Sequence, residues 1–355
     1  MLAGCRFAHF LQYGLRAQER EPAEFDSRFY GTFVHDVLEY IVQQTEREGG
    51  FAAVPRGRVQ ELAQERMEQN AQTLLETFPD SGRTGYLLRR TFDEVTQVVD
   101  ELYDELSVSA FRPKFCELEF SARGALPGVA FAGERCRGVV EGFVDRVDVW
   151  QSGGRPYVRV VDYKTGKKSF DYTNVLHGRG LQMLLYLFAL VRQGGHLLHG
   201  EPLPAGVLYF PARIERVSVR DRLAQAEIEK ERRKQLRRSG VLLNSDPVLE
   251  AMEPCGGSPR FLPYTLDKEG RKTGDLASFA QLAQLERFVF RTVTALGDEL
   301  ADGRIDPDPC IRDAKDSACA FCPYSEVCAG HEQPRWLKKI TAEEFWQTLE
   351  RREHG

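Results

Sequence analysis

The sequence predicts a mixed α/β fold in which a central sheet is flanked by helices, and two kinds of pattern support this prediction. Residues 138–150 (GVVEGFVDRVDVW) alternate between apolar and polar side chains, and residues 158–170 (VRVVDYKTGKKSF) begin as an apolar, β-branched run, so both are expected to contain strands. Residues 31–44 and 180–191 repeat apolar side chains at helical spacing. The chain has 355 residues, 42% of them hydrophobic, which is enough for a sizeable core.

The two strand-like runs are joined by QSGGRP, a short link that predicts an antiparallel hairpin. Alternation places Asp162 and Lys164 together at the end of the second strand, and it places Asp145 in a largely apolar row of the first. Asp145 and Asp162 could therefore meet at one end of the hairpin, although the sequence does not define the register. For residues 158–170 alone, a strand that runs out into a solvated turn is the simpler interpretation.

A pair of acids at this position has a chemical consequence. Two carboxylates at close range repel each other unless a cation lies between them. Oxygen ligands without a neighbouring thiolate favour Mg²⁺ or Mn²⁺. The hairpin end is therefore a candidate metal site.

Two predicted helices carry further polar groups on half-apolar faces. His35 shares a stripe with Leu38 and Val42, and a lone histidine of this kind is more often a satisfied core residue than a ligand. Gln182 and Tyr186 lie one turn apart on the second helix, where the pair alone would be read as core with a polar cap.

Taken in order, these four segments resemble the RecB-type nucleases of the PD-(D/E)XK superfamily. The matching motifs are GxxxHxxLE with His35, GxxDRxD with Asp145, VxDYKTG with Asp162 and Lys164, and LQxxxY with Gln182 and Tyr186. Each motif is weak alone, but the four in order form a specific signal. The resemblance implies a restriction-endonuclease-like core with a mixed central sheet, helical additions and a Mg²⁺-dependent deoxyribonuclease activity.

The resemblance also implies roles for the motif residues. Asp145 and Asp162 would hold the metal, and His35 and the backbone carbonyl group of Tyr163 would complete its shell. Lys164 would orient or deprotonate the attacking water, or stabilise charge on the phosphate. Gln182 and Tyr186 would steady the lysine and the DNA backbone. Glu39 and Glu141 could support the metal ligands, but a structural role is preferred for both.

The cysteines provide a separate signal. They are Cys5, Cys116, Cys136, Cys255, Cys310, Cys319, Cys322 and Cys328. The chain has no N-terminal secretory segment, so disulfides are not expected. The spacing C-x₂-C-x₅-C at Cys319, Cys322 and Cys328 lacks the second close pair of a zinc ribbon, and Cys310 does not make one. Three clustered thiolates and a distant cysteine suit an iron–sulfur cluster.

The segment CRFAHFLQYGLRAQERE resembles the opening element of AddB-type and CRISPR-associated RecB-like nucleases, with Arg6 in the place of the usual proline. This resemblance implies a [4Fe–4S] cluster held by Cys5, Cys319, Cys322 and Cys328, with Cys310 as the competing fourth ligand. The cluster would staple the chain ends around the nuclease core, shielded by Phe321, Pro323 and Tyr324. The remaining cysteines (Cys116, Cys136 and Cys255) are expected to be ordinary buried thiols.

The motifs divide the chain into five segments. Residues 1–30 contain the first cluster cysteine, 31–110 form a helical region with the His motif, 111–212 form the nuclease core, 213–275 form a charged insertion, and 276–355 contain C-terminal helices and the cluster motif. A further strand is expected at 206–212, and helices are expected at 276–300 and 335–355.

The insertion resembles the corresponding part of AddB, the nuclease-bearing subunit of bacterial AddAB helicase–nucleases. The resemblance implies a cytoplasmic module that processes double-strand DNA ends beside a helicase subunit of AddA type. AddB carries a helicase-like region before its nuclease domain, so the chain is expected to be a fragment, a split gene or an excised domain. It contains no G-x-x-x-x-G-K-[ST] phosphate loop, so unwinding would need a partner or further residues. A stand-alone CRISPR-associated-type exonuclease and a catalytically inactive DNA-binding scaffold are the alternatives.

The charge and hydropathy restrict the partners. A net charge of −5 does not favour nucleic-acid binding, but it can conceal a local basic groove. The run KERRKQLRRSG at 230–240 is one candidate, with a solvated helix face as the preferred interpretation. No apolar run approaches the roughly 18 residues of a membrane span, so no membrane partner is expected.

Overall fold

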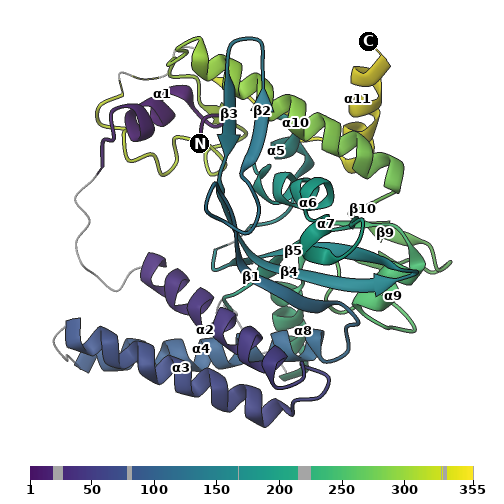
Figure 1. The fold of residues 1–355 in the computed structure, drawn as a ribbon. Coiled ribbons are helices and arrows are strands. Elements are labelled where there is room, and N and C mark those ends of the chain that lie inside the picture. Colours follow the sequence, from purple (N-terminus) through teal and green to yellow (C-terminus); the bar gives the residue numbers. More distant parts are fainter. Residues whose placement is uncertain are drawn as a thin grey trace.

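The computed structural model describes residues 1–18, 27–77, 82–166, 168–214, 225–328, 330 and 334–354. Within these residues, a six-stranded mixed sheet has the strand order β1-β4-β5-β6-β7-β10 (Figure 1). Its strands are β1 (Arg112–Phe120), β4 (Gly142–Ser152), β5 (Arg155–Lys164), β6 (Leu203–Pro211), β7 (Ser239–Leu243) and β10 (Leu276–Ala277). This confirms the predicted fold of a mixed central sheet with flanking helices.

The predicted hairpin forms the middle of the sheet. β4 and β5 pair antiparallel, with Arg146 opposite Val161 and Val147 opposite Val160. β5 and β6 are parallel, so the chain must cross over between them. This connection contains α5 (Tyr172–Leu176), α6 (Gln182–Gln193) and α7 (Gly195–Leu198).

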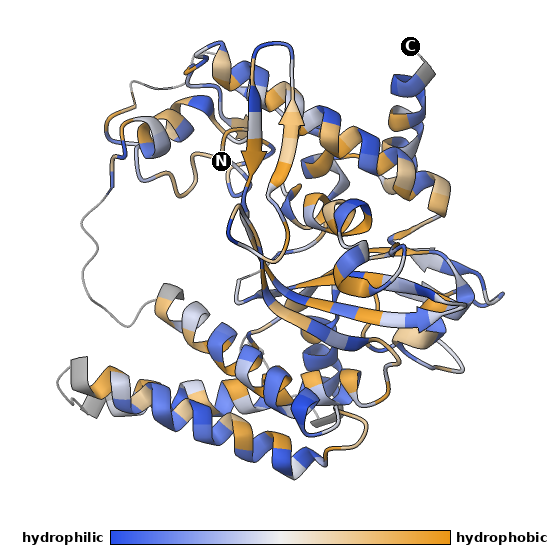
Figure 2. Cartoon of the chain, in the orientation of Figure 1, coloured by the Kyte–Doolittle hydropathy of each residue, from blue (hydrophilic) through white to orange (hydrophobic). Residues whose placement is uncertain are grey.

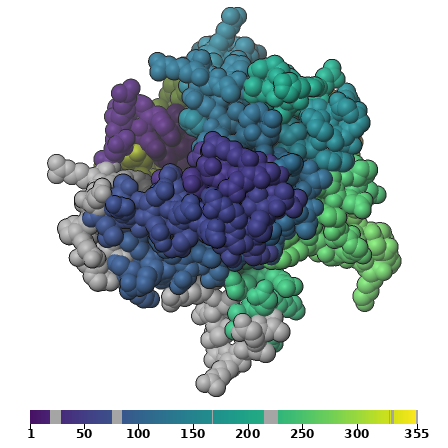
Figure 3. All heavy atoms as spheres, turned by 60° about the horizontal axis from the view of Figure 1, so that its bottom comes forward, coloured from purple at the N-terminus to yellow at the C-terminus, as the bar shows by residue number. Residues whose placement is uncertain are grey.

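Three long helices cover one side of the sheet: α2 (Ser27–Arg47), α3 (Arg56–Thr77) and α4 (Gly82–Leu106) (Figure 1). The apolar stripe of α4 explains its position, because Val95, Val98, Val99 and Leu102 recur at helical spacing and are fully buried. α3 is largely hydrophilic (Figure 2). In the view of Figure 3, residues of α2, α3 and α4 form much of the near face.

The other side is covered by α6 and by α10 (Phe279–Ala301), and α11 (Ala342–His354) packs against α10. Every residue of α6 from Met183 to Leu190 is buried, which explains its continuous apolar sequence. α10 begins with a capping box in which Ser278 and Gln281 satisfy each other's backbone N–H groups.

Smaller elements lie around this core. They are α1 (Arg6–His9), the π-helical turn η1 (Phe10–Gly14), β2 (Val129–Ala132), β3 (Arg137–Val140), α8 (Gln225–Leu236), α9 (Asp246–Met252), β8 (Tyr264–Leu266), β9 (Lys272–Gly274), β11 (Cys310–Ile311) and β12 (Arg335–Trp336). In the described residues, no helix is long and apolar enough to cross a membrane.

Two segments differ from the sequence-based expectation. β7 lies in the segment expected to be an insertion, yet it pairs with β6 in the central sheet, because the short apolar run Ser239–Leu243 follows the charged helix α8. Residues 335–355, expected to be one helix, contain β12 before α11 begins at Ala342.

A group of buried charges lies between the sheet and α4. Arg146 donates to Asp148, and Arg159 bridges Asp148 and Glu105 of α4 at 2.8 and 3.0 Å. Arg238 reaches the same Glu105 carboxylate at 2.7 Å. All five side chains are at most 2% exposed. The 230–240 run therefore differs from the expected solvated face at Arg238, which is buried because Glu105 and Phe210 receive its guanidinium group.

Candidate metal-binding and catalytic site

The charged end of β5 meets an acid on β4. The β4–β5 register pairs Arg146 with Val161, and one step further along it Asp145 lies opposite Asp162. Asp162 is only 8% exposed, so its carboxylate is not part of a solvated turn. The structure therefore brings together the two acids whose meeting the sequence left open.

His35 comes to the same place from α2. Its Nε2 atom lies 2.9 Å from the carbonyl oxygen of Tyr163, and its Nδ1 atom lies 3.6 Å from Oδ2 of Asp145. The backbone N–H of Tyr163 donates to that same Asp145 oxygen at 2.7 Å. His35 is therefore joined to the hairpin end and is not an isolated core residue.

Glu117 of β1 also faces this site and was missed by the sequence analysis. Ligand atoms of His35, Glu117 and Asp145 all lie within 4.8 Å of one another, an arrangement that could hold a metal ion. Glu117 has a left-handed backbone, with φ of 48°, where its strand passes Asp145. The only available signal was the alternation in FCELEF at 115–120, which does not reveal that β1 pairs with β4.

The electrostatics of the site favour a bound cation. Burial and then the charge of Asp162 raise the pKa of Asp145. Burial and then Asp145 raise the pKa of Glu117. Both shifts mean that the carboxylates are costly to ionise together, and a cation between them would remove that cost.

The donor set also fits a hard divalent ion. Neighbouring ligands of an octahedral ion with bonds of about 2.1 Å lie about 3 Å apart, and the 2.9 Å between His35 and the Tyr163 carbonyl oxygen is compatible with this. Oδ2 of Asp162 is buried and accepts no hydrogen bond within the described part of the chain, although the Lys164 ammonium group lies against it. This oxygen is therefore available as a metal ligand.

The other predicted residues lie around this centre. Tyr186 is buried, stacks on Phe120 with ring centroids 4.9 Å apart and donates to the carbonyl group of Glu141 at 3.4 Å. Gly142 is required here, because a Cβ atom would lie 1.9 Å from the Tyr186 hydroxyl. Gln182 is exposed at the start of α6. The proposed contacts of Gln182 and Tyr186 with Lys164 and with DNA therefore stay predictions.

The two acids that were given structural roles differ in their surroundings. Glu141 is exposed and accepts a hydrogen bond from the backbone of Ala122. Glu39 accepts one from Gln43 and lies close enough for its charge to raise the pKa of Glu117. Glu39 therefore contributes to the acidity of the site.

The four predicted cluster cysteines surround one cavity. Cys5, Cys319, Cys322 and Cys328 line a space of about 250 Å³ that is also lined by Pro307, Pro309 and Tyr324. Cys310, the competing ligand, does not line this cavity; its buried Sγ atom donates to the carbonyl group of Ala3. All eight cysteines are unpaired.

Ionic contacts bring the same distant segments together. Arg6 contacts both Asp308 and Glu299, and its backbone N–H donates to Asp308 at 3.0 Å. Arg335 donates to the carbonyl group of Ala3 at 2.9 Å. The arginine in the place of the usual proline is therefore a buried tie between residues 1–18 and the C-terminal part.

Two expectations about this region are wrong. Phe321 is 95% exposed and cannot shield the cavity, because it points out of the turn that carries the cysteines; Tyr324 is buried and bonds to the carbonyl group of Ala17. Cys255 is exposed in the loop that follows α9, where its Sγ atom lies 3.1 Å from the carbonyl oxygen of Gly257.

With this geometry established, comparison with known proteins identifies the family. The model of the PD-(D/E)XK nuclease superfamily matches residues 1–329. The chain belongs to this superfamily. PD-(D/E)XK nucleases use divalent metal ions, in agreement with the carboxylate and imidazole groups at the hairpin end.

Curated relatives are similar over nearly the whole chain. A protein of Moorella thermoacetica, named as the B-type subunit of an ATP-dependent helicase/deoxyribonuclease, is 34% identical over 333 residues, which cover 92% of this chain and 29% of that protein. Proteins of the same name from Thermoanaerobacter sp. and Clostridium perfringens are 29% and 27% identical over 98% and 99% of this chain, and 31% and 32% of their own lengths. The chain therefore spans about a third of the length of these relatives.

Proposed function

We propose that this PD-(D/E)XK chain is a metal-dependent DNA nuclease module. The observation that supports this proposal best is the convergence of Asp145, Asp162, His35 and Lys164 at one end of the β4–β5 hairpin. Elements from three parts of the chain build this end, and only the folded protein brings them together. Such an arrangement of two acids, an imidazole and an ammonium group suits phosphodiester hydrolysis.

The metal ligands in this proposal are Asp145, Asp162, His35 and the carbonyl group of Tyr163, with Glu117 close enough to join them. Bound Mg²⁺ or Mn²⁺ would neutralise charge on the phosphate and lower the pKa of a water molecule. The Tyr163 N–H holds Asp145, so the same residue orients two ligands through its two backbone groups.

Lys164 serves the reacting groups in this proposal. It projects from the end of β5, and its ammonium group is held against Asp162. From there it can donate a hydrogen bond to the attacking water or to a phosphate oxygen as negative charge develops. Asp162 thus orients the lysine as well as the metal, and Gln182 and Tyr186 would act beside them on the lysine and the DNA backbone.

We further propose that Cys5, Cys319, Cys322 and Cys328 hold a [4Fe–4S] cluster. The fit rests on four free thiols around one cavity and on the different hydrogen-bonded position of Cys310. The cluster takes four cysteine ligands and would have a structural role, because the cavity lies between the N-terminal segment and the C-terminal loop.

The wider role follows from the relatives. They are named subunits of ATP-dependent helicase/deoxyribonucleases, and this chain matches about a third of each. We infer an AddB-type exonuclease module that cleaves DNA strands at ends unwound by a helicase subunit of AddA type, in the cytoplasm. The β7-containing segment supports the AddB assignment, because it is part of the central sheet and not a separable addition.

The decisive experiment compares Asp162→Ala with Lys164→Gln on single- and double-stranded DNA ends in Mg²⁺. We expect both variants to lose cleavage, but only Asp162→Ala to lose Mn²⁺ binding by calorimetry, since an ammonium group is not a metal ligand. Near-normal cleavage by Asp162→Ala would contradict the proposed site. Loss of Mn²⁺ binding in Lys164→Gln would instead assign a structural role to the lysine.

A further inference from the structure

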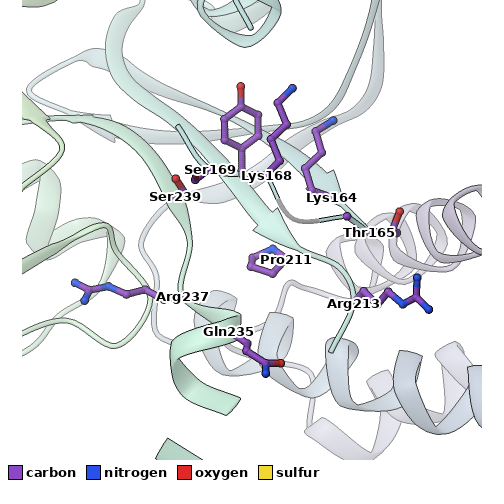
Figure 4. A pocket seen from close by; sticks show the side chains of 11 residues that line it. Lys164, Thr165, Lys168, Ser169, Pro211, Arg213, Gln235, Arg237 and Ser239 are labelled. Atoms are coloured by element: carbon purple, nitrogen blue, oxygen red, sulfur yellow. The ribbon is translucent and has the colours of Figure 1, made fainter. Parts of the chain in front are cut away.

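A basic cavity lies beside the proposed site, at the ends of β5 and β6 and the start of β7. It has a volume of about 300 Å³. Among the described residues that line it, every charged side chain is a cation: Lys164, Lys168, Arg213 and Arg237 (Figure 4). This cavity is a local concentration of positive charge on a chain whose net charge is −5. It is therefore the basic surface that the whole-chain charge concealed.

The two arginines are already engaged elsewhere. Arg237 donates to the carbonyl group of Leu262 at 3.0 Å and also to that of Tyr264. The guanidinium group of Arg213 lies 4.8 Å from the ring centroid of Tyr30. In Figure 4 the two side chains extend away from each other. They contribute charge to the cavity, but their donors are directed to protein groups.

The two lysines are arranged differently. Lys164 and Lys168 extend side by side in the same direction in Figure 4. The Lys168 Nζ atom lies 5.1 Å from the ring centroid of Tyr209. Desolvation, and then the charge of Lys164, lower the pKa of Lys168. An anion bound beside the two ammonium groups would relieve their repulsion.

The sheet register connects this cavity to the metal ligands. Asp162 pairs with Tyr209 of β6, and Tyr209 pairs with Ser239 of β7. The row that contains the acids therefore continues into residues that line the cavity. Neighbouring strands lie about 4.8 Å apart, so the row from Asp162 to Ser239 covers about 10 Å. This length leaves room for a neighbouring nucleotide beside the phosphate at the metal.

We propose that Lys168, with Lys164 beside it, binds a backbone phosphate of the DNA strand next to the phosphate that is cleaved. The inference rests on the proposed nuclease function and adds a direction to it: the strand crosses the sheet from the acids towards β7. Lysine is a point charge without base-reading geometry, so the contact is independent of sequence. Lys168 is a binding residue that does not touch the reacting atoms.

The test is DNA binding by Lys168→Gln, measured by fluorescence anisotropy without divalent metal, so that the strand is not cleaved. We expect weaker binding of a single-stranded oligonucleotide, and a log–log salt dependence shallower by about 0.7, the value for one phosphate contact on a single strand. Lys268→Gln is the matched control, because Lys268 is exposed and does not line the cavity. It should leave both quantities unchanged, and Lys168→Arg should keep most of the affinity.

Cleavage kinetics in Mg²⁺ complete the test. Lys168→Gln should raise KM more than it lowers kcat, because the lost contact exists before and during the reaction. Wild-type KM and an unchanged salt slope in this variant would overturn the inference while leaving the nuclease function intact. If the wild-type protein binds DNA but cleaves none with Mg²⁺ or Mn²⁺, the proposed function fails instead, and the binding data still decide the role of Lys168.

Discussion

Asp145 is the residue on which the largest number of opposing effects act in the site. It accepts a hydrogen bond from the Tyr163 N–H, and His35 lies beside it, but the charge of Asp162 opposes its ionisation. Its carboxylate therefore costs free energy in the metal-free protein and becomes useful only when a cation binds. Function and stability conflict at this residue.

The conflict predicts the behaviour of Asp145→Asn. An amide oxygen can still accept the Tyr163 hydrogen bond, but it removes the repulsion, so the metal-free variant should be more stable than the wild type by about 1 kcal/mol, the equivalent of roughly one pKa unit. Thermal unfolding in EDTA and in Mn²⁺ checks this. Mn²⁺ should stabilise the wild type and not the variant.

Glu141→Gln is the control, because Glu141 is exposed just before β4. It should behave like the wild type in both media. If Asp145→Asn is less stable than the wild type in EDTA, Asp145 serves the fold rather than a cation.

At the scale of elements, the β4–β5 hairpin has two different faces. One carries Asp145 and Asp162, and the other carries Arg146 and Arg159 in the buried charge group with Glu105. Tyr163 links the two, because its backbone holds Asp145 while its hydroxyl accepts from Arg146 at 2.9 Å. The buried charges thus fix the orientation of the strand segment that positions the metal ligands.

This arrangement predicts a large effect of Glu105→Gln. Although burial alone would raise it, the charges of Arg238, Arg159 and Arg146 lower the pKa of Glu105 to about 2. Removing its charge leaves buried guanidinium groups without a counterion, which should cost about 3–5 kcal/mol. Chemical denaturation at pH 7 measures this loss.

The pH dependence identifies the cause. A lowered folded-state pKa contributes stability that is present above the unfolded value of about 4.3 and lost as pH falls towards 2. The difference between the wild type and Glu105→Gln should therefore shrink as pH falls from 5 to 2. Glu101→Gln is the control and should cost under about 1 kcal/mol, since its partner Arg260 is partly exposed and also contacts Asp104. A Glu105→Gln loss of the same size as this control would contradict the role of the buried group.

The sequence could predict the elements but not all their neighbours. The hairpin, α2 and α6 follow from periodicity, because alternation and helical spacing are local properties. Glu117 could not be assigned, since its proximity to Asp145 depends on the pairing of β1 with β4. Arg238 looked like a surface charge because its partner Glu105 lies far away in the sequence. β7 was overlooked because five apolar residues after a charged helix are a weak signal.

At the scale of the whole molecule, the cysteine cavity joins the N-terminal segment to the C-terminal loop. Contacts of Arg6 with Asp308, and of Arg335 with Ala3, support the same junction without any cofactor. The proposed cluster would therefore strengthen a connection that the protein already makes.

Cysteine variants test the proposed cluster. Anaerobically purified wild-type protein should contain about four irons per chain. Cys5→Ala should lose iron and unfold at a lower temperature, because the cluster closes a very long loop. Cys310→Ala is the matched control and should keep its iron. One bound zinc in colourless protein, or iron lost from Cys310→Ala and kept in Cys5→Ala, would refute the ligand set.

The junction between Arg6 and Asp308 also has a consequence for biosynthesis. These partners lie 302 positions apart in the chain. A ribosome adds about 5 to 20 residues per second, so roughly 15 to 60 s separate their appearance. The β4–β5 hairpin, whose strands are neighbours in sequence, can pair well before that interval ends. A nascent chain can therefore assemble the acidic site early, while its first segment waits for the last part of the chain to be translated.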